Sequence, residues 1–326
     1  MREAFLLLAL SLVLAHAFTR LELVIEWAKF QNEFGRSYRS SLEAEKRFSI
    51  FEDNLREIEE HNRRYYNGEE SYTKGINEFA DWTDQEFMDY LNTYREEDYS
   101  DIPCEVFEPN SSYKVPDAVD WKRITRIKRQ GRCGSCWAFG SVGCLEAQLY
   151  LRKGVDIALS EQNLIDCSWE QGNSGCNGGG MGRAYQYIYQ HGIQSERDYP
   201  YRARAGVCQF ESERSVVSIS GYVKIRKNET DLMAAVASMG PVAIGMHSTK
   251  TLKAYRFGIL RIRNCKRFPL NHAAVLVGYG RDKGRDYYII KNSWGRKWGE
   301  QGYVRLGNRG SNPCGVADSA LFPKVV

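Results

Sequence analysis

The chain has 326 residues, of which 43% are apolar and 26% are charged. This composition excludes a disordered or collagen-like protein, and the length allows about two domains. The net charge is −11 over residues 1–114 and +15 over residues 115–326, which together give the overall +4. Because the basic residues are dispersed and an acidic segment of the same chain is available to pair with them, we expect no nucleic-acid partner.

An apolar stretch follows the first residues of the chain. It runs from Ala4 to Ala15, which is shorter than the roughly 18 apolar residues of a membrane-spanning helix, and it ends in a small-x-small triplet, residues 15–17. This pattern is typical of a secretory signal peptide, with a buried N-terminal helix as the alternative. We predict a signal peptide over residues 1–17, no membrane anchor, and an oxidising compartment in which at least one of the nine cysteines stays unpaired.

Two tripeptides of the form Asn-x-Ser/Thr fit the same route. They begin at Asn110 and Asn228, which are the two candidate glycosylation sites, and the sequence leaves open whether they are occupied. Such tripeptides also arise by chance, so the signal peptide remains the stronger argument for secretion.

The first third of the chain has a charged, helical pattern over residues 20–110. Within it, six residues between Ser41 and Asn62 recur at steps of three or four and therefore share one helix face. These residues are Glu43, Arg47, Phe51, Asn54, Ile58 and Asn62. Residues 75–81 then change to period two, which predicts a strand.

A capping box marks the start of the next predicted helix. Thr83 and Glu86 have the required spacing and precede an apolar pair. The acidic stretch 96–108 predicts an exposed linker. We therefore divide the chain after the signal peptide into a first unit, residues 18–114, and a second unit, residues 115–326.

The second unit changes from helices to strands along the chain. Apolar periodicity predicts three helices, at 136–152, 161–166 and 183–190. Short β-prone runs predict four strands, at 242–246, 273–279, 286–291 and 302–306. Helices followed by strands favour an α+β protein with two packed lobes.

Cys136 begins the first of these helices, directly after a turn that contains glycines. A thiol at a helix N-terminus lies at the positive end of the helix dipole, which lowers its pKa and favours the nucleophilic thiolate. The alternative for a cysteine in a secreted protein is a disulfide. A catalytic assignment therefore needs a proton acceptor elsewhere in the chain.

The second unit offers three histidines as that acceptor: His191, His247 and His272. His191 ends a predicted helix before a glycine, where capping is a more common role than catalysis. His272 begins one buried strand, and the next predicted strand ends just before Asn292. Adjacent strands would bring the Asn292 carbonyl to the imidazole, with Trp294 shielding that hydrogen bond.

Three blocks around these residues resemble the signature motifs of papain-like cysteine proteases. They are QGRCGSCWAF at 130–139, NHA at 271–273 and NSWG at 292–295. The helix face at 43–62 and the segment 75–81 resemble the inhibitory propeptide of the cathepsin L branch. Together the matches extend over residues 20–326.

The resemblance implies a two-lobed papain-like α+β fold, with a helical lobe, a β-barrel-like lobe and an active-site cleft between them, preceded by a helical propeptide. It implies a cysteine endopeptidase made as a zymogen, without cofactor or metal. Cys136 would be the nucleophile, His272 the general base and then acid, and Asn292 the orienting group. The Gln130 side chain and the Cys136 backbone N–H would form the oxyanion hole, where one donor is worth about 3 kcal/mol.

The same resemblance implies three disulfides, which spacing alone does not give. They are Cys133–Cys176, Cys167–Cys208 and Cys265–Cys314. Cys136 then stays free, Cys144 is expected as a small buried apolar residue, and the state of Cys104 in the linker is left open.

Positions that match the family's S2 pocket, which holds the second residue before the cleaved bond (P2), are apolar or small. The positions implied to contact substrate are Met181, Gly245, Leu270, Ala273 and Ser319 in the pocket, and Gly178, Gly179, Gly180, Asn271 and Trp294 beside it. Since no buried carboxylate is present among them to bind arginine, we expect apolar or aromatic P2 side chains.

The implied partners are protein and peptide substrates, the chain's own propeptide as inhibitor, and cystatin-type inhibitors, with the enzyme a monomer in a lysosomal or extracellular compartment. A silent binding protein on the same fold and another thiol acyltransferase are the alternatives. One departure concerns the segment from Trp121 to Gln130, which is about three residues shorter than in the family and raises the question of how Gln130 is held.

The opposite charges of the two units suggest that they dock partly by electrostatic attraction. Acidification would then protonate carboxylates of the first unit, weaken docking and permit cleavage near residues 114–116. The alternative is that these charges are solvated faces without a role in docking.

Overall fold

The structure is a computed structural model, and it describes residues 19–95, 103–262, 265 and 268–326. The expected signal peptide lies outside these residues. Among the helices of the described part, none has the length and apolar character of a membrane span.

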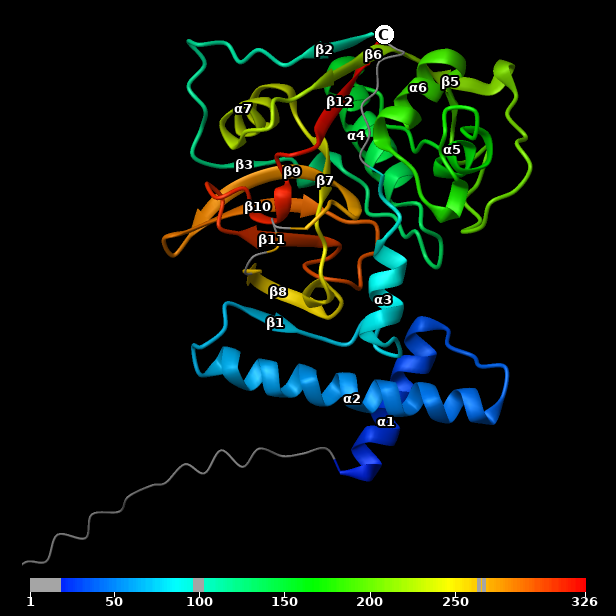
Figure 1. The fold of residues 1–326 in the computed structure, drawn as a ribbon, viewed down its shortest axis with the longest axis vertical. Helices are drawn as coiled ribbons and strands as arrows, with labels where there is room; N and C mark the ends of the chain where they lie inside the picture. Colours follow the sequence, from blue (N-terminus) through cyan, green and yellow to red (C-terminus); the bar gives the residue numbers. More distant parts are fainter. Residues whose placement is uncertain (1–18, 96–102, 263–264, 266–267) are drawn as a thin grey trace, which may run out of the picture.

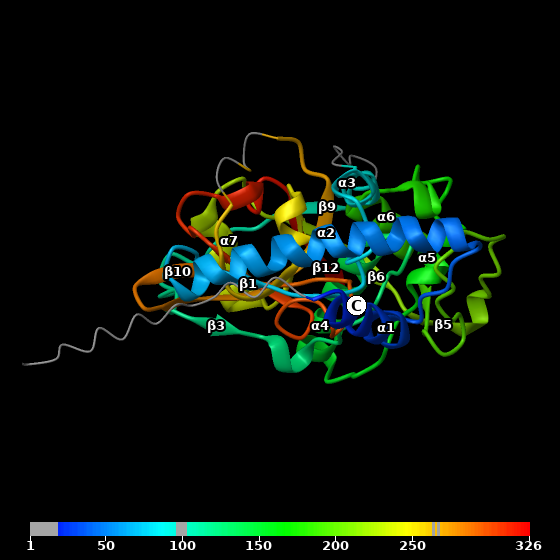
Figure 2. The same ribbon diagram turned by 90° about the horizontal axis from the view of Figure 1, so that it is seen from below.

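Two helices of the first unit cross each other below the rest of the molecule (Figures 1 and 2). They are α1 (Arg20–Phe34) and α2 (Ser41–Tyr66). Between them lies a small apolar cluster, separate from the main core, in which Trp27 packs on Phe51 with ring centroids 5.2 Å apart and Phe30 is buried. This helix pair therefore has a core of its own.

The helix predicted between Ser41 and Asn62 is confirmed as α2. Its polar side chains hold the segment that follows. Asn54 Nδ2 donates to the carbonyl oxygens of Ala80 and Trp82, at 2.8 and 2.9 Å, and Asn62 Nδ2 donates to a carbonyl in β1 (Tyr72–Lys74). The predicted helix face thus positions the chain that leads to the next helix.

The strand predicted over residues 75–81 is wrong. Strand structure in this region is limited to β1, and residues 75–81 lie outside any strand. The Asn77 side chain accepts a hydrogen bond from the Phe79 N–H at 2.9 Å, and the Ala80 N–H donates to the Asn77 carbonyl at 3.0 Å. These local bonds of an asparagine side chain stabilise a turn in place of a strand ladder.

The four shorter helix predictions are confirmed. A Thr83–Glu86 capping box starts α3 (Asp84–Leu91), as expected. The three helices of the second unit form one lobe: α4 (Cys136–Lys153), α5 (Glu161–Cys167) and α6 (Met181–His191). A further helix, α7 (Glu229–Met239), was not predicted.

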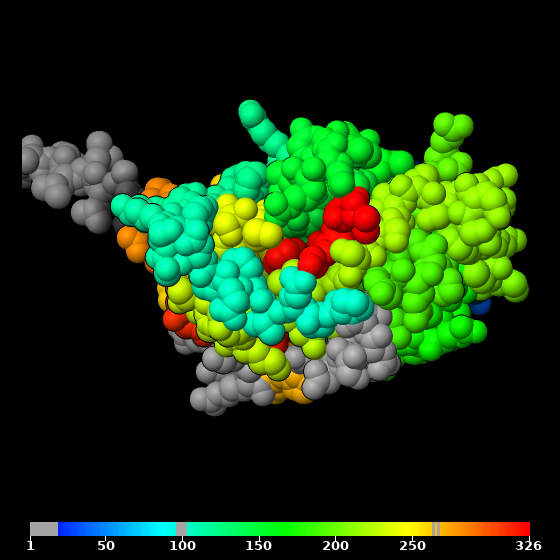
Figure 3. Space-filling view, turned by 90° about the horizontal axis from the view of Figure 1, so that it is seen from above, coloured from blue at the N-terminus to red at the C-terminus, as the bar shows by residue number. Residues whose placement is uncertain are grey.

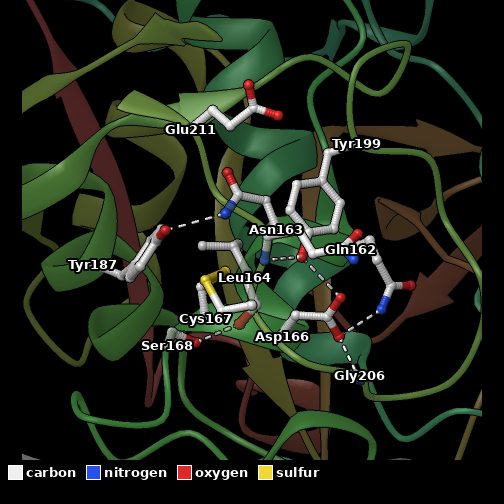
Figure 4. The surroundings of a disulfide bond; sticks show 12 residues. Gln162, Asn163, Leu164, Asp166, Cys167, Ser168, Tyr187, Tyr199, Gly206 and Glu211 are labelled. Atoms are coloured by element: carbon white, nitrogen blue, oxygen red, sulfur yellow. Dashed lines mark hydrogen bonds between the residues drawn. A yellow bond between two sulfur atoms is a disulfide. The ribbon is translucent and has the colours of Figure 1, made fainter. Parts of the chain in front are cut away.

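A disulfide closes the helical lobe at the end of α5 (Figure 4). It joins Cys167 to Cys208. Next to it, the Asp166 carboxylate accepts hydrogen bonds from the Tyr199 hydroxyl at 3.0 Å and from the Gly206 N–H at 2.7 Å. The loop before Cys208 is therefore tied to α5 by both covalent and charge-assisted bonds.

The four predicted strands are confirmed, and the large sheet contains more. The confirmed strands are β7 (Val242–Met246), β9 (His272–Asp282), β10 (Arg285–Lys291) and β11 (Tyr303–Gly307). The sheet also contains β6 (Ile219–Lys224), β8 (Tyr255–Leu260) and β12 (Ala320–Val325), and short β3 (Val119–Asp120) pairs with β9. A separate two-stranded sheet is formed by β4 (Ile193–Gln194) and β5 (Ser215–Val217). The fold is thus α+β with a helical and a β-rich lobe, as expected (Figure 1).

Both terminal strands of the large sheet come from the first unit. The order is β1-β8-β11-β10-β9-β7-β12-β6-β2, where β2 (Cys104–Val106) pairs in parallel with β6. In the described part of the predicted linker, residues 103–106 and 108 are exposed as expected, but Phe107 is buried and Cys104–Val106 form a strand. Residues 103–118 (turquoise) lie over the face shown in Figure 3, beside C-terminal residues (red). The first part of the predicted linker, residues 96–102, lies outside the described residues.

Candidate active site

Cys136 is the first residue of α4, and its side chain is buried between the two lobes. The preceding turn is tightly packed: a Cβ on Gly134 would lie 2.4 Å from the Cys176 carbonyl oxygen and 2.5 Å from the Thr93 side chain. Only glycine fits there, because real Cβ atoms do not approach other atoms so closely. The turn is further fixed by the Cys133–Cys176 disulfide.

His272 and Asn292 come from neighbouring antiparallel strands, as the sequence predicts. His272 begins β9, Asn292 directly follows β10, and His272 Nε2 lies 2.9 Å from Asn292 Oδ1. Asn292 Oδ1 also accepts the Ser293 N–H at 2.9 Å, which fixes the orientation of the amide. Since a carbonyl oxygen only accepts, Nε2 carries the proton and Nδ1 is left unprotonated in the neutral ring.

Trp294 covers this hydrogen bond. Its ring centroid lies 5.1 Å from that of His272, and its side chain is almost completely buried. The ring therefore excludes water from the imidazole–amide pair, in which a hydrogen bond is stronger than in solvent.

Gln130 is held from three sides despite the shortened segment before it. Its backbone N–H donates to the Ser293 carbonyl at 2.8 Å, its Oε1 accepts the Ser293 hydroxyl at 2.5 Å, and its Nε2 donates to the Cys133 carbonyl at 2.9 Å. Ser293 was missed at the sequence level as a positioning residue. Its place between Asn292 and Trp294 in the motif was the available signal.

A segment of the first unit covers the cleft. After α3, the Thr93 hydroxyl lies 3.7 Å from the Cys136 sulfur. The Gly179 N–H donates to the Thr93 carbonyl at 3.0 Å. The Gly179 carbonyl accepts the Arg95 N–H at 2.9 Å. A Cβ on Gly178 would lie 2.3 Å from the Thr93 carbonyl oxygen, so this glycine permits the close approach. Cys136 is therefore shielded from any substrate in this form.

Burial in the closed cleft shifts the pKa values of Cys136 and His272. Burial raises the pKa of the Cys136 thiol, although hydrogen bonds near the helix N-terminus act in the opposite direction. Burial also lowers the pKa of His272 to about 4, against the effect of its bond to Asn292. The lowered thiol pKa expected from the helix dipole is therefore wrong for this closed form, because desolvation is the larger effect.

Two of the positions predicted for the S2 pocket lie against one side chain of the first unit, Tyr94. A Cβ on Gly245 would lie 2.6 Å from the Tyr94 ring and 3.0 Å from the Leu270 side chain, and the Ser319 hydroxyl lies 2.8 Å from the Tyr94 hydroxyl. Met181 and Ala273 are fully buried, and both would contact a Cβ on Gly140 of α4, at 3.3 and 3.4 Å.

Two other predicted substrate positions, Asn271 and Gly180, form hydrogen bonds with other parts of the second unit. The Asn271 side chain bonds the backbone of Ser248, with Oδ1 accepting its N–H at 2.7 Å and Nδ2 donating to its carbonyl at 3.0 Å. The Asn271 carbonyl accepts the Tyr94 N–H at 3.4 Å, so this residue faces the cleft through its backbone. The Gly180 N–H donates to Asn173 Oδ1, at the start of α6.

The cysteines form the three pairs that the resemblance implies. The third of these, Cys265–Cys314, lies in the β-rich lobe. Cys104 is exposed and unpaired, and Cys144 is buried with its thiol donating to the Pro241 carbonyl. Within the described residues, no cluster of histidine, cysteine and acidic side chains has the arrangement of a metal site.

Both sequon asparagines lie on the surface. Asn110 Oδ1 accepts the Ser112 N–H and hydroxyl, at 3.0 and 2.7 Å. Asn228 is the N-cap of α7, where its Oδ1 accepts the Asp231 N–H. In both, the side-chain carbonyl oxygen is the bonded atom, and both residues are exposed.

Comparison with known proteins agrees with this geometry. Residues 115–324 match the family described as papain family cysteine protease, and residues 27–87 match the cathepsin propeptide inhibitor domain (I29). Procathepsin L of Rattus norvegicus is 40% identical over 92% of both chains, and digestive cysteine proteinase 1 of Homarus americanus is 37% identical over 92% of this chain and 94% of its own.

Solved structures are similar over nearly the same span. Digestive procathepsin L 3 of the Tenebrio molitor larval midgut superposes with a TM-score of 0.88 at 40% identity, covering 93% of this chain and 99% of its own. The chain therefore belongs to the papain family of cysteine proteases, and it is a cysteine endopeptidase of the cathepsin L type made as a zymogen.

Proposed function

We propose that Cys136, His272, Asn292 and Gln130 carry out the hydrolysis. The observation that carries this is the His272–Asn292 hydrogen bond of 2.9 Å in the cleft that contains Cys136. Nε2 donates to Asn292, so Nδ1 is the imidazole nitrogen that takes the thiol proton. The thiolate attacks the peptide carbonyl, the imidazolium protonates the leaving amine, and water then hydrolyses the acyl-enzyme.

The oxyanion is stabilised by the Gln130 Nε2–H and the Cys136 backbone N–H in this proposal. Gln130 Nε2 has two protons, and one is used in the bond to the Cys133 carbonyl. The second is available to the developing negative charge. We expect Gln130→Ala to lower kcat about 100- to 1000-fold, the usual loss of one oxyanion-hole donor. Steady-state kinetics on a peptide substrate measures this, and an unchanged kcat would remove Gln130 from the mechanism.

The roles of the thiols are tested directly by labelling. An epoxide inhibitor of thiol proteases is expected to modify Cys136 in the activated enzyme, and Cys136→Ala is expected to be inactive. Cys144→Ala is the matched control, since Cys144 is buried on the same helix and burial raises the pKa of its thiol to about 12. Labelling that persists in Cys136→Ala, or activity in that variant, contradicts the proposal.

We also propose residues 18–114 as the propeptide and residues 115–326 as the mature enzyme, with cleavage near residues 114–116. Among the residues that the structure describes, five acidic side chains of the first unit form ion pairs with basic side chains of the second unit. The pairs are Glu33–Lys297, Glu78–Arg129, Asp84–Lys250, Glu105–Lys324 and Glu108–Arg226. In each of these pairs the acidic partner belongs to the first unit and the basic partner to the second, which supports docking by charge.

The remaining parts of the proposal concern specificity and location. Gly245 and Leu270 in the S2 pocket support apolar or aromatic P2 residues. We place the enzyme in the secretory pathway, with a lysosomal or extracellular destination, and propose a monomer that cystatin-type proteins inhibit at the cleft. Glycans at Asn110 and Asn228 fit this route. Mass analysis of the secreted precursor before and after deglycosylation tests it.

A further inference from the structure

The occupant of the S2 pocket in the zymogen has a polar end. Tyr94 is 4% exposed, and its hydroxyl lies 2.8 Å from the hydroxyl oxygen of Ser319, which is half-buried. Two hydroxyl groups at this distance form a normal O–H···O hydrogen bond, in which either oxygen is able to donate. The pocket is therefore apolar along its walls but hydrogen-bonding where the tip of an aromatic side chain ends.

The wall of the pocket is shaped for a six-membered ring. A Cβ on Gly245 would lie 2.6 Å from Cε1 and 3.0 Å from Cζ of Tyr94, and 3.0 Å from Leu270 Cδ1. Any larger residue at position 245 would collide with the ring near its hydroxyl end. Glycine at this position thus leaves space down to Ser319 that a branched aliphatic side chain cannot fill completely.

Ser319 is placed by the sheet and not by its occupant. Its carbonyl accepts the Gly245 N–H at 2.8 Å, and the next residue, Ala320, pairs with Ile244 in the β7–β12 ladder. The serine therefore remains at the end of the pocket after the propeptide leaves. A hydroxyl group held by a rigid element is a suitable recognition group for a ligand hydroxyl.

We propose that Ser319 makes this protease selective for tyrosine over phenylalanine at P2. The inference rests on the proposed function, since it assigns Gly245, Leu270 and Ser319 to the P2 pocket. Tyrosine at P2 would repeat the Tyr94–Ser319 bond, whereas phenylalanine has no hydroxyl to make it. The Tyr94 backbone runs parallel to the chain at Gly179.

The test uses the self-activated enzyme and three fluorogenic peptides that differ only in P2: tyrosine, phenylalanine and leucine. We expect kcat/KM for the tyrosine peptide to exceed that for the phenylalanine peptide about 3- to 10-fold, the range of one neutral hydrogen bond. Ser319→Ala should bring this ratio to 1 or below. Ser220→Ala, an exposed serine on β6, is the control and should keep the wild-type ratio.

A second measurement reads the same bond in the full-length precursor. Tyr94→Phe should accelerate self-processing in the wild-type background but not in the Ser319→Ala background, because the two hydroxyls act as a pair. Equal acceleration in both backgrounds overturns the proposal. So does a tyrosine-to-phenylalanine ratio of 1 in the wild type, or one that Ser319→Ala leaves unchanged.

Failure of this inference is distinguishable from failure of the proposed function. If the phenylalanine and leucine peptides are cleaved, Cys136 is labelled, and the tyrosine-to-phenylalanine ratio of kcat/KM is 1, then only the role of Ser319 is wrong. If none of the three peptides is cleaved and Cys136 is not labelled, then the catalytic assignment itself fails.

Discussion

The propeptide meets the enzyme through two regions of opposite character. The region from Phe79 to Tyr94 lies within the main apolar core, where Phe79 and Phe87 contact Trp294 edge-on with centroids 5.2 and 5.5 Å apart. The outer region, α1 and α2, has a core of its own and contacts the enzyme through polar side chains: an exposed ion pair, Glu33–Lys297, and a hydrogen bond from Lys253 Nζ to Asn54 Oδ1 at 2.8 Å. Since an exposed pair contributes at most about 1 kcal/mol, apolar burial supplies most of the strength of inhibition.

The aromatic region offers the largest expected effect. Phe87 is completely buried, and Phe87→Ala should remove about 3–5 kcal/mol of docking and folding energy from the propeptide. We expect this precursor to become active at neutral pH, where the wild type stays latent. Tyr66→Ala, an aromatic residue that is 80% exposed at the end of α2, is the control. Peptide hydrolysis during incubation at pH 7 measures both variants. Continued latency of Phe87→Ala would show that the ion pairs of the outer region, and not the aromatic region, keep the precursor inactive.

Acidification should destabilise the buried region of the precursor more than its ion pairs with the enzyme. His272 has a folded pKa of about 4 against an ordinary value near 6.5, so the unfolded chain binds more protons between these values. Its contribution to stability is complete above about pH 6.5 and is lost as the pH falls towards 4, by about 3 kcal/mol. By contrast, hydrogen bonds from Lys250 and Lys253 keep the pKa of Asp84 below its ordinary value despite partial burial, so this carboxylate stays charged.

Two inactive precursors separate these contributions. The free energy of unfolding in urea should fall more steeply between pH 6.5 and pH 4 for Cys136→Ala than for Cys136→Ala/His272→Gln. His61, whose pKa burial also lowers, is present in both and cancels in the difference. Identical pH profiles would show that the acid sensitivity originates elsewhere.

An ion pair at the border of the two regions should have an intermediate effect. Glu78 is almost completely buried, and its carboxylate accepts two hydrogen bonds from Arg129, at 2.8 and 2.6 Å. Glu78→Gln should accelerate maturation about tenfold, because a hydrogen bond between charged groups is worth about 1.5–3 kcal/mol. Asp89→Asn, which changes an exposed carboxylate on α3, is the control and should change the maturation rate little. Equal maturation rates for Glu78→Gln and Asp89→Asn would show that the Glu78–Arg129 pair does not help to keep the precursor inactive.

The outer rim should have the smallest effect. Glu33 and Lys297 are each about half exposed, at 51% and 54%, and their charged atoms are 3.2 Å apart. Glu33→Gln should change the maturation rate less than about threefold, and 0.5 M salt should abolish that difference. A larger effect that persists in salt would show that charge attraction holds the propeptide in place.

Sequence reasoning succeeded where a strong local pattern coincided with a motif. The apolar runs after His272 and before Asn292 predicted adjacent strands, and the observed hydrogen bond follows from that adjacency. It failed for the turn at Asn77, because one asparagine side chain replaced the ladder that the alternation indicated. It also did not find β12, where Pro323 interrupts the strand signal.

The contents of the cleft were beyond sequence reasoning for a different reason. Nothing in the local pattern around Tyr94 shows that the chain passes Ser319, which is 225 positions away. That contact depends on the packing of α3 against the second unit. Only the three-dimensional structure places the two hydroxyls side by side.

The sheet order has a consequence for what maturation leaves behind. Strands β1 and β2 cover β8 at one end of the large sheet and β6 at the other. With the cleavage proposed near residues 114–116, their removal would turn both β8 and β6 into open edges, with unpaired backbone groups that another chain is able to extend. The precursor, in which both edges are paired, is therefore the form that is better protected from edge-to-edge aggregation at high concentration.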